Sequence, residues 1–195
     1  IMPSLVGSEM CIRDRYKRNI YGTPSDSCGD YAWIQHMICS MSSGKGRMAV
    51  VMPQGILFRG NQEAEIRKQL VESDLIEAVV TLGDKLFYGT GLSPCFLIIR
   101  RMKQAHHSGR ILMIDGSKIL TQKRAQNILE ENDIDRLYSL YQNYSDEEDY
   151  SRIVTLQEIR DKEYNLSPNR YVVYHKEEIR PYAEVLAEFK QAYEL

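Results

Sequence analysis

Two aromatic residues in a glycine-rich loop are the strongest candidates for ligand contact. Phe87 and Tyr88 lie in the segment GDKLFYGTGLSP, from Gly83 to Pro94, which contains three glycines and one proline. Glycine lets a backbone take conformations that other residues avoid. Because the loop follows a predicted strand, its rings are placed to stack on a flat ligand such as a nucleobase. Phe87 could instead close the end of the sheet as a core residue, and the sequence leaves both roles open.

A second loop, PQGILFRGN (53–61), offers Phe58, Arg59 and Asn61. It follows one predicted strand and leads into the N-terminus of a predicted helix. In open α/β sheets ligands bind at this edge. These three residues could therefore face a substrate or a nucleic-acid backbone. The structural alternative is that Phe58 belongs to the core, Arg59 is solvated and Asn61 only caps the helix.

Other common catalytic patterns are missing from the sequence. It has no G-x-G-x-x-G, no G-x-x-x-x-G-K-[ST] and no G-x-S-x-G segment. The four histidines have no carboxylate or cysteine at ligand spacing, so we expect no metal site. The chain therefore carries no self-sufficient catalytic constellation, and we assign no catalytic residue.

The elements that must position the two loops can be read from hydrophobic patterning. Asp30 can cap a helix that runs to about Met41. An almost wholly apolar run, typical of a strand covered on both faces, precedes the loop at Pro53. Asn61 can cap the next helix, whose buried stripe includes Ile66 and Leu70. The predicted strands are 47–52, 75–82, 95–100 and 110–115, and the predicted helices are 30–41 and 62–72.

The connections between these strands predict a particular sheet. Strands 47–52 and 75–82 are joined through a helix, so we expect them to lie side by side and run in the same direction. The gap before strand 95–100 is too short and too rich in glycine to hold a helix, so this strand must turn back antiparallel. The prediction is an α/β protein with the C-terminal half of a doubly wound, Rossmann-like sheet and a reversed final strand.

After Gly116 the pattern becomes mainly helical. A helix over 132–144 would turn Ile134, Leu137, Leu140 and Tyr141 towards the core, and Thr155 with Glu158 forms a capping box for a short helix. YNLSPNRYVVY (164–174) is predicted as a loop followed by a strand, and 175–195 as an amphipathic helix. We therefore divide the chain into a leader at 1–15, a partial catalytic domain at 16–117 and an α-rich extension at 118–195.

Composition limits the functional classes. The chain has 195 residues, 43% hydrophobic and 27% charged, with a net charge of −2. This suits a globular protein of about one domain plus an appendage. No apolar run approaches the roughly 20 residues of a membrane span. Cys39 and Cys95 sit among apolar residues, which favours buried thiols in a reducing cytoplasm. Because the chain is not basic, any DNA contact must be local or shared with a partner.

The first residues have an unusual origin. The string LVGSEMCIRD (5–14) resembles the translation of a sequencing-library adapter. It lacks the long apolar core and the cleavage site of a signal peptide. We expect the native sequence to begin near Tyr16 and to continue upstream in residues that this chain lacks. A true leader is the alternative.

From Tyr21 onward the sequence resembles the modification (M) subunit of type I restriction–modification systems. The motifs that carry the resemblance cover about nine-tenths of the chain, in the order and spacing of that family. They are YGTP with DYAWIQHM, GRMAVVMPQGILFRG, IRKQLVESDLIEAVVTL, LFYGTGLSPCFLIIRR and YNLSPNRY. The resemblance implies an adenine-specific DNA methyltransferase that moves a methyl group from S-adenosylmethionine to the exocyclic amine of a flipped adenine.

The resemblance also implies what is missing. Such enzymes bind the methyl donor at a glycine-containing loop and hold the target amine with an Asn/Asp-Pro-Pro-aromatic motif, and neither occurs in this chain. We therefore expect both to lie upstream and the isolated chain to be inactive. By the same resemblance Phe87, with Tyr88 as its neighbour, stacks on the extruded adenine, and Arg59 contacts DNA or a partner.

The implied partners are DNA, a specificity subunit and, where one is present, a restriction subunit. The extension from Lys118 would then be scaffold for subunit contact. An alternative is a non-catalytic module that serves DNA docking or assembly of a restriction–modification complex. Upstream sequence distinguishes the two, because donor-binding and amine-binding motifs in frame would favour the enzyme.

Overall fold

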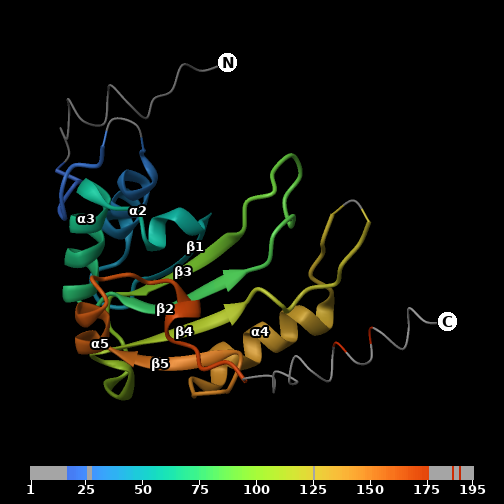
Figure 1. Ribbon diagram of the computed structural model, residues 1–195. Helices are drawn as coiled ribbons and strands as arrows, with labels where there is room; N and C mark the ends of the chain where they lie inside the picture. The colour runs from blue at the N-terminus through green and yellow to red at the C-terminus, as the bar shows by residue number, and fades with distance from the viewer. Residues whose placement is uncertain (1–16, 26–27, 125, 176–185, 187–188, 190–195) are drawn as a thin grey trace.

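A single mixed sheet, with helices on both faces, forms the framework of the protein (Figure 1). The computed structural model describes residues 17–175, apart from 26, 27 and 125, together with 186 and 189. Five strands lie in the order β1-β3-β2-β4-β5. Their bounds are β1 Arg47–Pro53, β2 Ile76–Leu82, β3 Pro94–Arg100, β4 Arg110–Gly116 and β5 Ser151–Thr155.

The reversed strand is confirmed, but its place in the sheet differs from the prediction. β3 runs antiparallel to both β1 and β2. β1 and β2 therefore point in the same direction, as expected, yet they do not lie side by side, because β3 is inserted between them. The crossover through α3 (Asn61–Glu72) skips one strand position, and the returning strand fills it. On the other side β2 pairs with β4 in parallel.

β1 is an outer strand and is not covered on both faces as its apolar sequence suggested. Alternate residues Arg47, Ala49 and Val51 are exposed, whereas Met52 packs in the core. Among the described residues, β1 pairs only with β3. β2 shows the opposite pattern, because all of its residues are buried. The sequence of β1 therefore resembles a central strand although its position here is at an edge.

The helices divide between the two faces of the sheet. α2 (Asp30–Ser40), α3 and α5 (Leu156–Asp161) cover one face, and α4 (Glu131–Asn143) packs against the other (Figure 1). The first face holds the larger core, in which Ile34 and Ile38 of α2 and Ile66 and Leu70 of α3 are buried. On the second face Leu140 of α4 contacts a smaller cluster on β2 and β4.

Asp30 and Asn61 do not perform the N-cap roles predicted for them. Gly29 precedes α2, and Asp30 is the first helical residue, with its carboxylate bound to Arg59. Gly60 precedes α3, and Asn61 begins the helix with a φ of 57° and without a side-chain capping bond. Both polar residues lie one position inside the turn that they were expected to cap.

The region beyond Gly116 adds a strand to the same sheet. β5 pairs antiparallel with β4, which makes it the second edge. The capping box of Thr155 and Glu158 is confirmed at the start of α5. Leu140 is buried as predicted, but Ile134 is 52% exposed. The strand predicted at the end of 164–174 does not form, and a 3₁₀ turn at Pro168–Arg170 stands before it. The helix predicted for 175–195 falls almost entirely outside the described residues.

The cysteines differ from one another in exposure. Cys95 is buried on β3, and burial raises the pKa of its thiol to about 12. Cys39, which was predicted to be buried, is exposed near the end of α2. Cys28, Cys39 and Cys95 all have free thiols. In the part of the chain that the structure describes, no helix has the length and apolar character needed to cross a bilayer.

A buried carboxylate fastens the C-terminal segment to the sheet. Asp115, near the end of β4, accepts hydrogen bonds from the Thr81 hydroxyl at 3.1 Å, the Ser117 amide at 3.0 Å and the Tyr174 hydroxyl. Burial alone would raise the pKa of Asp115, but these hydrogen bonds outweigh burial and lower it. The ionised carboxylate is therefore the form that the fold stabilises.

This cluster predicts a pH-dependent effect of Tyr174→Phe. At pH 7 we expect the variant to lose about 1–2 kcal/mol of unfolding free energy. A carboxyl whose folded pKa is lowered contributes stability above its unfolded pKa, near about 4, and loses it as the pH falls through the folded pKa. The difference from wild type should therefore shrink between pH 5 and pH 2, measured by urea unfolding. Tyr138→Phe, at an exposed tyrosine, is the control. A loss that stays constant with pH would contradict the role of Asp115.

Candidate functional site

An apolar groove lies at the sheet edge where β1 ends and β3 begins. Pro53 and Pro94 are register partners at this edge, and Phe87 comes from the loop between β2 and β3. The groove has a volume of about 210 Å³. It is lined by Val51, Met52, Pro53, Phe87, Thr90, Leu92, Ser93 and Pro94. Its walls are almost wholly hydrophobic, and this small size suits a single flat ring better than a larger ligand.

Phe87 and Tyr88 occupy different positions. Phe87 is half exposed and borders the groove, so it can offer a ring face to a ligand while its other side packs. Tyr88 is 92% exposed and does not line the groove. Of the two predicted stacking residues, the geometry therefore favours Phe87. The alternative of Phe87 as a buried core residue does not fit its exposure.

The base of the Phe87 loop is fixed by a segment far along the chain. The backbone nitrogen of Asn127 donates to the Lys85 carbonyl at 3.1 Å, and its side-chain Nδ2 donates to the Asp84 carbonyl at 3.1 Å. The Gln126 side chain donates to the Leu86 carbonyl at 2.9 Å. Figure 1 shows the loop between β2 and β3 and the segment before α4 projecting from the same end of the sheet. These bonds hold the backbone immediately before Phe87.

Gly83 is required where this loop leaves β2. A Cβ at this position would stand 2.8 Å from the Ser117 carbonyl oxygen and closer still to the Leu120 side chain. Real Cβ atoms do not approach a fixed backbone oxygen so closely. The loop can therefore pass this close to the segment 117–120 only because residue 83 has no side chain.

The three candidates of the loop after β1 (53–61) do not gather in the groove. Phe58 is 54% exposed, so it is not the core residue of the structural alternative. Asn61 lies at the exposed first turn of α3. Arg59 turns towards α2 and is held there by ion pairs. Within this loop Pro53 lines the groove, and the Gln54 backbone nitrogen beside it donates to the Ser93 carbonyl at 3.3 Å.

Arg59 is the centre of a cluster that also contains a thiol. Its Nη1 lies 2.8 Å from the Asp30 carboxylate, 3.4 Å from that of Glu63 and 2.7 Å from the Cys28 sulfur. The donor atoms of Cys28, Asp30 and Glu63 lie within 4.8 Å of one another, as metal ligands do. The guanidinium already compensates the carboxylates, and burial together with Glu63 raises the pKa of Cys28 to about 11. We interpret this cluster as structural, because Arg59 already neutralises its carboxylates.

Arg67 connects the loop after β1 (53–61) with the YNLSPNRY motif. This α3 residue is 2% exposed. Its guanidinium donates to the Arg59 carbonyl at 2.8 Å, the Ile56 carbonyl at 3.3 Å and the Tyr164 carbonyl at 2.8 Å. The Leu166 amide adds a bond to the Leu57 carbonyl at 2.9 Å. The segment around Tyr164, which lies 97 residues downstream of Arg67, thus supports the loop after β1.

The sequence prediction missed the residues that hold the loops in place. Gln54, Arg67, Gln126 and Asn127 all act through backbone carbonyls or amides, which leave no motif in a single sequence. One signal was available for Arg67. It lies beside Ile66 on the buried stripe of α3, where a charged side chain needs several partners.

Comparison with solved structures defines the class of fold. The structure aligns with a type I restriction–modification methyltransferase subunit from Streptococcus thermophilus at a TM-score of 0.74 and 30% sequence identity, covering 86% of this chain and 35% of that one. The fold of this chain is thus similar to about a third of a solved type I restriction–modification methyltransferase subunit.

Sequence comparison identifies the family. The model for N-6 DNA Methylase matches residues 7–179, and the chain belongs to this family. It is 38% identical over 185 residues to the type I restriction enzyme MjaVII methylase subunit of Methanocaldococcus jannaschii, with 89% of this chain and 31% of the relative covered. It is 31% identical over 160 residues to the HindI methylase subunit of Haemophilus influenzae, with 78% and 35% covered. The chain therefore spans about a third of these relatives.

The Arg67 contacts predict a large effect of Arg67→Met. The substitution keeps the apolar stem but removes the donors of three carbonyl groups, so we expect a loss of about 2–4 kcal/mol of unfolding free energy. Hydrogen exchange should also become faster at Leu166 and in the loop 54–60. Arg160→Met is the matched control, because Arg160 forms an exposed ion pair with Glu72 and exposed pairs contribute little to stability. Equal losses in both variants would contradict the special role of Arg67.

Proposed function

We propose that this chain is part of an adenine-specific DNA methyltransferase subunit of a type I restriction–modification system. The reaction transfers a methyl group from S-adenosylmethionine to the exocyclic amine of adenine in DNA. Family membership supports the reaction class, and the apolar groove beside Phe87 is the observation that supports a base-binding role. A specificity subunit and, where present, a restriction subunit are the protein partners of this proposal.

In this proposal the chain supplies one wall of the pocket for the flipped adenine. Phe87 stacks on the extruded base, and Pro53, Leu92 and Pro94 exclude water from its edge. Stacking on an aromatic side chain contributes about 1–3 kcal/mol per base and depends little on which base is stacked. Tyr88, which is 92% exposed, is the neighbouring candidate for the same stacking contact. Phe58, Arg59 and Asn61 remain candidates for DNA or partner contact outside the groove.

The described residues do not by themselves form a site for S-adenosylmethionine. The groove has no carboxylate for ribose hydroxyl groups, and the nearby carboxylates Asp30 and Glu63 are engaged by Arg59. The sequence also lacks the amine-holding Asn/Asp-Pro-Pro-aromatic motif. We therefore assign no step of methyl transfer to residues of this chain. Its contribution is to position the base, which matters because a misplaced acceptor reduces the rate steeply.

The isolated 195-residue chain should therefore transfer no methyl group. Incubation with duplex DNA and radiolabelled S-adenosylmethionine should give incorporation indistinguishable from a protein-free blank. A full-length relative, such as the MjaVII methylase subunit with its partners, is the positive control. Incorporation above the blank by this chain alone would show that donor and amine sites exist within it.

The stacking role of Phe87 is tested with a fluorescent base. In a full-length relative, the residue aligned with Phe87 is changed to Ala, and the target adenine is replaced by 2-aminopurine, whose emission changes when it leaves the duplex and stacks on a ring. We expect the emission of the bound complex to change. On a second duplex that keeps adenine at the target position, we expect the variant to methylate that adenine at least about tenfold more slowly.

Substitution at the position aligned with Tyr88 is the control and should have a smaller effect. An unchanged emission and rate in the Phe87-position variant would remove Phe87 as the stacking residue. The family assignment would stand in that case, since it rests on the comparisons.

A further inference from the structure

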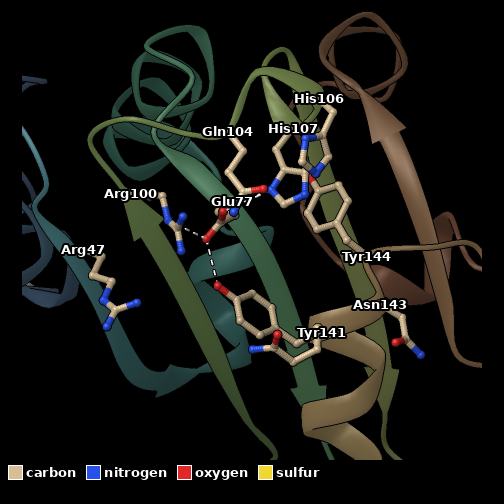
Figure 2. A pocket seen from close by; sticks show the side chains of 10 residues that line it. Arg47, Glu77, Arg100, Gln104, His106, His107, Tyr141, Asn143 and Tyr144 are labelled. Atoms are coloured by element: carbon tan, nitrogen blue, oxygen red, sulfur yellow. Dashed lines mark hydrogen bonds and ion pairs between the residues drawn. The ribbon is translucent and has the colours of Figure 1, made fainter.

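A polar pocket opens at the other end of the sheet, where β1 and β2 begin and β3 ends (Figure 2). It has a volume of about 290 Å³. The length of β2, at about 3.3 Å per residue, places it about 20 Å from the groove at Phe87. Strands supply Arg47, Glu77 and Arg100, the connector after β3 supplies Gln104 and two histidines, and the last turn of α4 forms the facing wall. This pocket has no part in the proposed base-binding role.

A β-bulge turns Glu77 into this pocket. The pairing of β2 with β3 shifts register between Ile76 and Ala78, so Glu77 is the extra residue. Bulges redirect side chains and recur next to functional sites. The Glu77 carboxylate is 1% exposed. It accepts a hydrogen bond from the Tyr141 hydroxyl at 2.9 Å and lies 3.1 Å from Arg100 Nε and 3.2 Å from His107 Nδ1.

Two arginines stand directly opposite each other at this end of the ladder. Arg47 and Arg100 are register partners, so their side chains share one face of the sheet, as Figure 2 shows. Like charges in this position repel. The Glu77 carboxylate neutralises Arg100. The buried Nε of Arg100 nevertheless forms no aligned hydrogen bond. No carboxylate lies within ion-pair distance of Arg47 among the described residues.

The remaining groups of the pocket leave the positive charge of Arg47 uncompensated. Burial lowers the pKa of His107, so at neutral pH it donates to Glu77 without adding charge. Its ring stacks on Tyr144 at a centroid distance of 3.5 Å, which fixes it in the wall. The C-terminal end of α4 brings peptide carbonyls to the facing side, and these disfavour an anion there. An anion would therefore bind on the strand side, between the two guanidinium groups.

We propose that this pocket binds a phosphate group, held between the guanidinium groups of Arg47 and Arg100. Arginine binds phosphate oxygens through paired N–H donors. Glu77, itself fixed by Tyr141 and His107, orients Arg100, and Gln104 offers a further amide donor at the rim. The space exceeds that of a single oxyanion, so the phosphate can be free or part of a small monoester. An anion here would also remove the repulsion between the two arginines.

The test measures binding to the full 195-residue chain by calorimetry at constant ionic strength. Inorganic phosphate and adenosine monophosphate are the two probes, with chloride as the background anion. We expect saturable binding of at least one of them, weakened about tenfold or more by Arg47→Ala. Arg47 is exposed and lacks an ion-pair partner among the described residues, so this variant should fold as the wild type does. Tighter binding of the nucleotide would identify a monoester as the ligand, and equal binding would identify free phosphate.

Two control variants separate the pocket from general charge effects. Arg124→Ala removes an exposed arginine elsewhere, and Asn143→Ala alters the helix wall of the pocket. Both should retain phosphate binding. No saturable binding by the wild type, or binding equally reduced by Arg124→Ala, would overturn the proposal. Binding of duplex DNA that depends on Arg47, without any effect of small phosphates, would overturn it too, and the base-binding role of Phe87 would be unaffected by either result.

Discussion

The insertion of β3 between β1 and β2 is the constraint on which the rest of the structure depends. The chain leaves β2 without a helix, so it must return antiparallel, and it does so in the position beside β2 that the α3 crossover has passed over. The β1–β3 ladder then determines which residues meet at each of its two ends. Pro53 and Pro94 meet at one end and Arg47 and Arg100 at the other. The apolar groove and the polar pocket are two consequences of the same register.

Buried charges fasten the elements to this sheet in two different ways. Arg67 is buried among carbonyl groups, so its charge is dispersed over backbone dipoles from two distant segments. Glu77 and Asp115 instead collect donors from side chains, and each joins strands to a later part of the chain. Such groups cost desolvation free energy and stabilise only one arrangement of their partners. They therefore specify how the C-terminal region packs on the sheet.

Local features of the fold were predictable from the sequence, and relations between distant segments were not. The bounds of β1 to β4, the reversal of β3 and the capping box at Thr155 depend on short patterns and were predicted. β5 was missed, and the strand predicted within 164–174 does not form. The position of β3 between its neighbours was missed, because the sequence encodes direction through the connection but not which side the strand takes. The predictions that Cys39 is buried and that Asp30 caps a helix were wrong. Both properties depend on which residues lie nearby in space, and for Asp30 that residue is Arg59.

The candidate site was predictable to the same extent. Phe87 could be found because glycines mark the loop and aromatic rings have few uses at an exposed tip. The supports of that loop, Gln126 and Asn127, could not, since an amide side chain on a carbonyl has no sequence signature. Glu77 was also missed. In the sequence Glu77 is only a single charged residue within an apolar strand. The β-bulge that turns its side chain into the pocket cannot be recognised from the sequence.

The exposed side of β1 has a consequence for how this chain meets other polypeptides. Its outer row of amide and carbonyl groups is open among the described residues, and main-chain groups of this kind accept any extended segment that can align with them. Pro53 has no amide hydrogen, so an added strand would find donors only further back, towards Arg47. Purified alone at high concentration, the chain is thus prone to edge-to-edge association, and a soluble preparation would benefit from a lysine on this outer row.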